Sequence, residues 1–372
     1  MKRSTERILT THIGSLPRDE RLRQLLDAKQ RGEPAPELEP ELRSAVQATV
    51  SKQLEIGLDV INDGEMAKPT WSGYVRDRLT GFESKPITTQ KGREQAEFPE
   101  YWSNRGGAFF SGGSANMMTC TGPIEYVGQA QAARDVANLK AAVASQKPVE
   151  VFMAAVGPDN IGYHPGQNQF YASDHEYLKA NAAAMRNEYK AITDAGFILQ
   201  IDTPVMKFNA LNLTVPEFRQ RFEKLIGVYH DMLSGIPREQ VRMHICFGGG
   251  RGPHTGDIML RDFIDLVLQM PVTGISFDQN VRHEHEWKVF RDIKLPPDKV
   301  LIPGVVAHTT DTVEHPELVS DRLVRLAQLV GRENVMAGTD CGLGGRLPGE
   351  IVWAKFRSMV EGAKLASKEL WS

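Results

Sequence analysis

Short stretches of apolar, mostly β-branched residues alternate along the chain with longer amphipathic segments. Eight of the short stretches are predicted to be β-strands, at residues 7–14, 58–63, 149–157, 197–202, 241–248, 273–278, 299–306 and 334–340. Between them, apolar residues recur at helical spacing, as in residues 175–196, 215–235 and 317–331. Strands that are apolar on both faces and alternate with helices are typical of a parallel sheet, and eight of them predict a closed (β/α)8 TIM barrel. The alternative is an open doubly wound sheet, but no GxGxxG motif follows the first strand.

Residues 82–148 interrupt this alternation. Their first part, residues 82–118, is irregular in pattern. We therefore expect a single barrel domain over residues 1–372, with residues 82–148 inserted between its second and third strands. Long loops within compact domains are uncommon and often functional.

The composition is that of an ordinary folded protein, and it narrows the possible functions. Apolar residues make up 41% and charged residues 24% of the 372 residues, and 44 basic against 47 acidic side chains leave a net charge of −3. This balance argues against partners such as nucleic acid or a membrane surface. No apolar run reaches the ~18 residues of a membrane-spanning helix, and the first residues lack the apolar region of a secretion signal.

The three cysteines, Cys120, Cys246 and Cys341, are too few for a disulfide framework. Reduced thiols are expected, which favours a cytoplasmic protein. The sequence does not reveal the oligomeric state.

Polar residues at the ends of the predicted strands point to a metal site, because the active site of a barrel lies at the carboxyl ends of its strands. His244 and Cys246 are two residues apart near the end of the fifth predicted strand, so their side chains face the same way. Cys341 follows the eighth strand and approaches from across the barrel. One histidine and two cysteines suit zinc, and three protein ligands with an open position are typical of a catalytic zinc site.

Other residues are candidates for supporting roles. Asp278 ends the sixth predicted strand, where it is either a fourth, displaceable metal ligand or a loop-capping residue. Cys120 has no histidine nearby in sequence, so we interpret it as a small buried side chain. His283 and His285 share a face only on a strand, and we expect a structural role for them. His254, in a glycine-rich loop, is a candidate for closing the site.

Arg18, Arg251 and Arg282 are candidates for binding an anionic group. Each of them, taken alone, is more typical of a solvated loop arginine.

Five motifs in a fixed order resemble those of one enzyme family. They are THIGSLPR at 11–18, DVINDGE at 59–65, LQIDTP at 199–204, HIC at 244–246 and GTDCGLG at 338–344. Together they resemble the cobalamin-independent methionine synthase family, in its single-barrel branch, which corresponds to the catalytic C-terminal half of that enzyme. The same superfamily contains the epoxyalkane:coenzyme M transferases. The motifs extend over nearly the whole chain.

The resemblance implies a zinc-dependent barrel that activates a thiol for alkylation. By similarity to the family, His244, Cys246 and Cys341 are zinc ligands. The family's remaining ligand is a glutamate, and this chain has the shorter Asp278 in its place. His308 stands near the position of the histidine that handles the proton in the family, shifted by one residue.

The same similarity assigns the acceptor site. Ile13, Ser15, Glu65 and Asp202 match the residues that contact homocysteine in the family. As paired anions, Glu65 and Asp202 are suited to hold a substrate ammonium group. Asp202 is counted as both a catalytic and a substrate-binding residue.

The function expected from this resemblance is zinc-dependent transfer of a methyl group to the thiol of homocysteine or of a similar small thiol. The identity of the methyl or alkyl donor stays open. The close alternative is alkyl transfer from an epoxide to coenzyme M, whose sulfonate the two acidic residues would repel. Two further alternatives are a zinc-stabilised binding barrel without catalysis and a metal-free barrel of the decarboxylase type.

Overall fold

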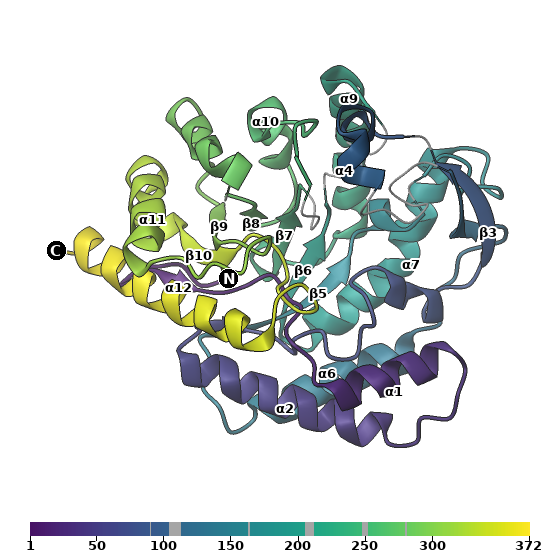
Figure 1. The fold of residues 1–372 in the computed structure, drawn as a ribbon, viewed down its shortest axis with the longest axis horizontal. Helices are drawn as coiled ribbons and strands as arrows, with labels where there is room; N and C mark the ends of the chain where they lie inside the picture. Colours follow the sequence, from purple (N-terminus) through teal and green to yellow (C-terminus); the bar gives the residue numbers. More distant parts are fainter. Residues whose placement is uncertain (90, 104–112, 163, 205–211, 248–251, 280) are drawn as a thin grey trace.

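A parallel sheet of eight strands forms the centre of the molecule (Figure 1). The computed structural model describes residues 1–372 except 90, 104–112, 163, 205–211, 248–251 and 280. The strand order is β1-β10-β9-β8-β7-β6-β5-β2, and each pair of neighbours is parallel. The strands are β1 (Leu9–Thr10), β2 (Val60–Ile61), β5 (Glu150–Val156), β6 (Ile198–Asp202), β7 (Val241–Ile245), β8 (Gly274–Phe277), β9 (Val300–Val306) and β10 (Met336–Thr339).

Hydrogen bonds between β1 and β2, the two ends of this order, close the sheet into a barrel. The backbone N–H of Asp59 donates to the carbonyl oxygen of Thr10 at 3.2 Å. The hydroxyl of Thr11 donates to the carbonyl oxygen of Val60 at 3.0 Å. The predicted (β/α)8 barrel is therefore confirmed. β1 and β2 are much shorter than the predicted stretches 7–14 and 58–63. Side chains such as that of Thr11 form part of the hydrogen bonding between these two strands in place of the backbone.

Helices surround the barrel (Figure 1). They are α1 (Glu20–Gln30), α2 (Leu38–Ile56), α6 (Gln129–Val143), α7 (Asp174–Asp194), α9 (Val215–Met232), α10 (Ile264–Val267), α11 (Pro316–Val330) and α12 (Gly349–Leu370). In α11, the helically spaced Val319, Leu323 and Leu326 are all buried, as an amphipathic helix packed on a barrel requires. None of the helices in the described ranges is long and apolar enough to cross a membrane.

Residues 82–148 contain two different structures. β3 (Phe82–Thr89) and β4 (Gly113–Cys120) pair antiparallel in a separate two-stranded sheet. Two short helices, α3 (Arg93–Glu97) and α4 (Pro99–Ser103), lie between these strands in the sequence. α6, by contrast, packs against α2 and α7, so it belongs to the helical layer of the barrel.

An apolar layer and polar side chains share the interior of the barrel. The apolar layer consists of Leu9, Val60, Phe152, Ile198, Ile302 and Met336. The buried guanidinium of Arg242 lies 3.6 Å from the ring centre of Phe152 and donates to Gln200 Oε1 at 2.8 Å. Burial lowers the pKa of Arg242 to about 9. Gln200 and Arg242 precede Asp202 and His244 by two residues, so each shares a strand face with the site residue that follows it.

Candidate metal centre

Three candidate metal ligands come together at the mouth of the barrel. His244 lies in β7, Cys246 directly follows that strand, and Cys341 follows β10. One ring nitrogen of His244 and the two sulfur atoms lie within 4.8 Å of one another, and the sulfur atoms are 3.6 Å apart. Both cysteines are free thiols. The structure therefore brings together side chains that are far apart in the sequence.

The geometry of this group fits a zinc ion. Two thiolates on one tetrahedral zinc, each at ~2.3 Å, are separated by about 3.8 Å, and the sulfur atoms here are 3.6 Å apart. His244 contacts the hydroxyl of Ser276 through Nδ1 at 3.3 Å, whereas its buried Nε2 has no partner with full hydrogen-bond geometry among the described residues. The imidazole nevertheless lies close enough to Cys341 to help lower the pKa of that thiol. Buried polar atoms normally have partners, and a metal ion would supply one.

The two thiols hold their protons very differently. The Cys246 thiol donates to Cys341, which lowers the pKa of Cys341 well below its usual value, and the nearby Arg346 guanidinium acts in the same direction. The same hydrogen bond, together with burial, raises the pKa of Cys246. The lowered pKa of Cys341 favours its thiolate, the form in which cysteine binds metals.

Asp278 lies beside this group but not within it. Its Oδ2 accepts the backbone N–H of Phe247 at 3.1 Å, and its buried Oδ1 has no hydrogen-bond partner among the described residues. Burial raises the pKa of Asp278 well above its usual value, and the negative charges of Asp340 and Cys341 raise it further. Its oxygens are not among the atoms that lie within 4.8 Å of one another. A direct bond from Asp278 to the metal thus stays a prediction.

Two buried carboxylates lie near the sulfur atoms. Asp202 ends β6, and Glu65 follows β2 in a turn where its backbone φ is 55°, a left-handed value that is uncommon outside glycine. The chain passes close to Glu65 at Gly14, where a Cβ would collide with the Glu65 carboxylate. Burial raises the pKa of both carboxyl groups, and the charge of Glu65 raises that of Asp202 further. An added positive charge would stabilise both as carboxylates.

Gln200 holds Asp202 in place, and the sequence analysis did not identify it. Its Nε2 donates to Asp202 Oδ1 at 2.8 Å and also to the carbonyl oxygen of Ile13. The sequence could have indicated Gln200 only by its position two residues before Asp202, because alternate residues of a strand share a face.

The sequence analysis also did not identify two basic residues of the site, Lys68 and Arg346. The Lys68 ammonium group donates to the carbonyl oxygen of Ala154, and its charge opposes the rise in the pKa values of Glu65 and Asp202. Arg346 lies near the sulfur atoms, and the negative charge of Cys341 raises its pKa. In the sequence, Lys68 and Arg346 are marked only by lying near a motif. The folded loops are what bring these two cations to the site.

One cavity of about 240 Å³ connects most of these residues. Its lining includes Ile13, Ser15, Arg18, Glu65, Trp71, Asp202, His244, Cys246, Cys341 and Arg346. All four predicted substrate-binding residues and three of the four predicted metal ligands therefore face one space. Asp278 and His308 are not among the lining residues. His308 is buried, and its charge lowers the pKa of Cys341, so it lies in the neighbourhood of the thiol.

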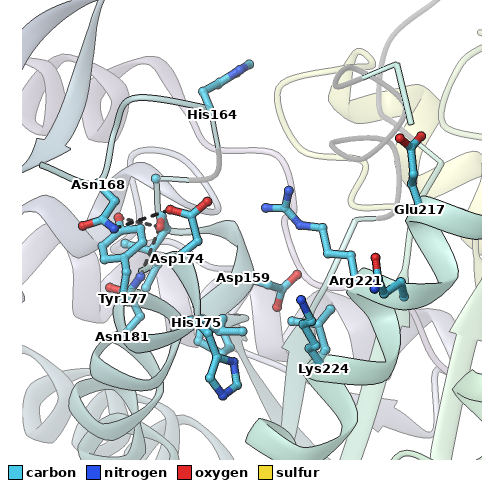
Figure 2. Close-up of a pocket in the computed structure, with 16 residues that line it drawn as sticks. Asp159, His164, Asn168, Asp174, His175, Tyr177, Asn181, Glu217, Arg221 and Lys224 are labelled. Atoms are coloured by element: carbon cyan, nitrogen blue, oxygen red, sulfur yellow. Dashed lines mark hydrogen bonds between the residues drawn. The ribbon is translucent and has the colours of Figure 1, made fainter. Parts of the chain in front are cut away.

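A second cavity, of about 250 Å³, lies between α7 and α9 (Figure 2). Asp174 and His175 belong to α7, while Arg221 and Lys224 belong to α9. Asp159, from the segment after β5, lies between the two helices (Figure 2). The lining of this second cavity contains no cysteine and none of the site residues predicted from the sequence.

A cluster of histidine and carboxylate side chains supports the loop that follows β7. His283 donates from Nε2 to Asp257 Oδ2 and from Nδ1 to Glu286 Oε2, both at 2.9 Å, and its ring stacks on Phe247 at 3.8 Å. Asp257 also accepts from His254 Nδ1 at 2.8 Å. Burial works to lower the pKa of His283, but the two hydrogen bonds outweigh it and raise the pKa to about 9. Both ring nitrogens are thus already engaged, as a structural role requires.

The sequence matches the model of a family described as cobalamin-independent synthase, catalytic domain, over residues 8–96 and 167–365. The chain belongs to this family. Relatives named methionine synthase include that of Sulfolobus acidocaldarius, with 25% identity over 365 residues, covering 97% of this chain and 93% of the relative. That of Saccharolobus solfataricus has 26% identity over 373 residues, covering 97% of this chain and 95% of the relative. The resemblance carried by the five motifs is confirmed.

Solved structures share the fold. A B12-independent methionine synthase from Shewanella sp. W3-18-1, in complex with selenomethionine, aligns with a TM-score of 0.74 at 21% identity, covering 98% of this chain and 99% of that chain. A putative vitamin-B12 independent methionine synthase from Listeria monocytogenes aligns with a TM-score of 0.64 at 19% identity, covering 96% and 98%. At these identities the likeness establishes the barrel architecture.

Proposed function

We propose that this protein is a zinc-dependent methyltransferase that transfers a methyl group to the thiol of homocysteine or of a similar small amino thiol. Family membership supports the reaction class, since the relatives are named methionine synthases. The observation that carries the proposal is that a His–Cys–Cys group and a buried carboxylate pair share one cavity. The first suits a thiol sulfur, and the second suits an ammonium group.

His244, Cys246 and Cys341 would hold the zinc ion with one position left for the acceptor sulfur. When bound there, zinc would stabilise the acceptor as a thiolate near neutral pH. The pKa of Cys341 is lowered even without a metal ion, and the Arg346 guanidinium offsets part of the negative charge of the Cys341 thiolate. Asp278 would serve as a fourth ligand when no acceptor is bound, because its buried Oδ1 has no other partner among the described residues.

Glu65 and Asp202 would bind the ammonium group of the acceptor. Burial disfavours the charge of both carboxylates and raises their pKa values, so an incoming ammonium group stabilises them. Gln200 keeps Asp202 in position, and Ile13 lines the same cavity. Coenzyme M has no ammonium group, and its sulfonate would meet like charges here, which favours an amino thiol as the acceptor.

In the transfer step, the acceptor sulfur forms a bond to the methyl carbon while the bond between that carbon and the donor breaks. The donor fragment keeps the electron pair of the broken bond, and a nitrogen leaving group must also take a proton. We propose that His308, buried near Cys341, holds this proton. Because all three cysteines are free thiols, we further propose that the protein works in the reducing cytoplasm.

Metal analysis of the purified protein tests the proposal, followed by methyl-transfer assays with homocysteine and coenzyme M as alternative acceptors. The assays use a panel of methyl donors that includes methyltetrahydrofolate. We expect about one zinc ion per chain, product only with homocysteine, and loss of product after chelation. A protein that binds no zinc and methylates neither thiol with any donor would contradict the proposal.

A further inference from the structure

Arg18 places a fixed positive charge in the wall of the metal cavity, next to Glu65. Its Nη2 donates to the main-chain carbonyl oxygens of Glu65, at 2.6 Å, and of Lys68, at 2.5 Å. Its Nε is buried without a hydrogen-bond partner. Within the described ranges of the chain, no carboxylate forms an ion pair with this guanidinium at 4.0 Å or less. The side chain is therefore held in place while its charge remains available.

The buried Arg78 of the same chain shows what is missing at the partly buried Arg18. The guanidinium of Arg78 forms ion pairs with Asp135 at 2.5 Å and with Glu188 at 2.9 Å. A buried charge normally has such partners. Arg18 has only main-chain carbonyl oxygens as hydrogen-bond acceptors, and burial lowers its pKa although acidic residues lie nearby. This leaves a place for an anion that the chain itself does not supply.

The position of Arg18 matches the layout of an α-amino acid. The ammonium and carboxylate groups of such a molecule are attached to one carbon atom, so the protein groups that bind them must be neighbours. Glu65 provides this link, because its carboxylate faces the cavity while its main-chain carbonyl oxygen holds Arg18. A cation and an anion of the protein thus lie side by side, as a zwitterion requires.

The other candidate arginines do not fit this role. Arg346 lines the same cavity, but it lies near the sulfur atoms, and the charge of Cys341 raises its pKa. Arg282 is exposed and lines a separate surface hollow. Arg251 lies outside the described residues. Arg18 is therefore the arginine best placed to meet an anion beside the carboxylate pair.

We propose that Arg18 binds the carboxylate of the acceptor amino acid while Glu65 and Asp202 bind its ammonium group; this inference rests on the proposed function. The Nη1 group of Arg18 forms no hydrogen bond with a described residue, so its N–H donors are available for a carboxylate oxygen. Because two carbonyl oxygens already hold Arg18, little side-chain freedom is lost when the acceptor binds. The cavity then recognises the whole zwitterion, and an amino thiol without a carboxylate is a poor acceptor.

Calorimetric titration of the zinc-loaded protein tests this assignment without turnover. The probes are L-methionine, the thioether product, and L-methioninol, which keeps the ammonium group but has a hydroxymethyl group instead of the carboxylate. We expect the wild type to bind methionine about 10- to 100-fold more tightly than methioninol, as is typical for hydrogen bonds to charged groups. Arg18→Gln should abolish this preference, and Arg18→Lys should keep part of it. The methyl donor is absent, so an anion on the donor does not contribute.

Arg282→Gln is the matched control, because it removes the same side chain outside the cavity, and it should bind both probes like the wild type. Thermal melting checks that each variant is folded. If Arg18 only braces the loop at residues 65–68, Arg18→Gln will weaken both probes equally, which overturns the assignment. Equal binding of the two probes by the wild type also overturns it but leaves the methyl-transfer proposal intact. A wild type that binds neither probe overturns both.

Discussion

Two cavities of nearly equal size, about 240 Å³ at the barrel mouth and about 250 Å³ between α7 and α9, differ in the state of their ionisable groups. In the first, Glu65, Asp202 and Cys246 are buried, and their pKa values are raised. In the second, Asp174 and Lys224 are exposed. Volume therefore does not distinguish the two cavities. Burial also lowers the pKa of Arg221 in the second cavity, so the difference is that several carboxyl and thiol groups with shifted pKa values gather in the first.

The buried acid of the second cavity strengthens this contrast. Asp159 Oδ1 accepts from the hydroxyl of Tyr229 at 2.8 Å, and its Oδ2 accepts from Asn160 Nδ2 at 2.8 Å. Both oxygens are thus satisfied within the protein. At the barrel mouth, His244 Nε2 and Asp278 Oδ1 are buried without hydrogen-bond partners among the described residues. The second cavity also has such an atom, Asn181 Oδ1, but of the two cavities only the barrel mouth combines an unsatisfied imidazole nitrogen with two thiols, the combination that suits a metal ligand set.

Replacing Cys341 by Ser should have the largest effect. The change removes the thiol with the lowered pKa from the His–Cys–Cys group. We expect zinc affinity to fall by more than about 100-fold, beyond what the loss of an outer partner causes, and methyl transfer to be lost with it. Equilibrium dialysis against zinc measures the change. Cys120→Ser, in β4 and outside the metal cavity, is the control and should retain its zinc. A Cys341→Ser variant with full zinc content would refute the site.

Asp202→Asn should weaken methionine binding without destabilising the fold. Loss of the charge should weaken methionine binding by about 10- to 100-fold. Burial raises the pKa of Asp202 above 3.8, so the folded protein holds this proton more tightly than the unfolded chain does. Stability due to Asp202 is therefore lost as the pH rises above 3.8, and the variant avoids that loss.

Metal-free Asp202→Asn should consequently melt at a higher temperature than the wild type at about pH 8, with the difference shrinking towards about pH 4. Calorimetric scans across this range measure it. Asp174→Asn makes the same chemical change in the second cavity and should alter neither methionine affinity nor the melting profile. If Asp202→Asn is less stable than the wild type at high pH, burial does not dominate its titration.

Asp278→Asn should reduce zinc affinity by about 10- to 100-fold, because an oxygen with little negative charge is a weak ligand. Methionine binding at saturating zinc should change much less, since the variant leaves Glu65 and Asp202 untouched. Asp278→Glu moves the carboxylate by one methylene group and should also alter zinc affinity. Unchanged zinc affinity in both variants would show that Asp278 has only its hydrogen bond to Phe247 as a role.

His283→Gln should remove a pH-dependent contribution to stability behind the metal cavity. The pKa of His283 is raised from 6.5 to about 9, so the imidazolium stabilises the fold fully below pH 6.5. This contribution is lost as the pH rises from 6.5 to about 9. Denaturant unfolding of wild type and variant across this window should therefore converge at high pH. Parallel curves would exclude a folded-state imidazolium.

Changes in the second cavity should have the smallest effect. Lys224 is exposed on α9, and no site residue predicted from the sequence lines that cavity. Lys224→Ala should change zinc affinity, methionine affinity and turnover by less than about twofold, as is usual for surface substitutions. A clear loss of turnover without a change in zinc or methionine binding would mean that the second cavity serves the reaction, and the contrast between the two cavities would fail.

The candidate site could be predicted in part. His244 and Cys246 were recognisable because alternate residues of a strand share a face, and Glu65 and Asp202 because motifs resemble a known family. Gln200, Lys68 and Arg346 were not predicted, because each acts through contacts that form only in the folded chain. Arg18 could not be distinguished from Arg282 in the sequence, because only the folded chain puts one in the cavity wall and the other on the surface.

The chain's pattern of apolar residues by itself determined the order of strands and helices, and hence the barrel, because backbone geometry ties side-chain periodicity to each element. It also determined that polar residues gather at the strand ends. Only the tertiary structure decided which of those ends meet: Cys246 and Cys341 are 95 positions apart, yet their sulfur atoms are 3.6 Å apart. Barrel closure sets that distance through hydrogen bonds between strands, and no local pattern records it.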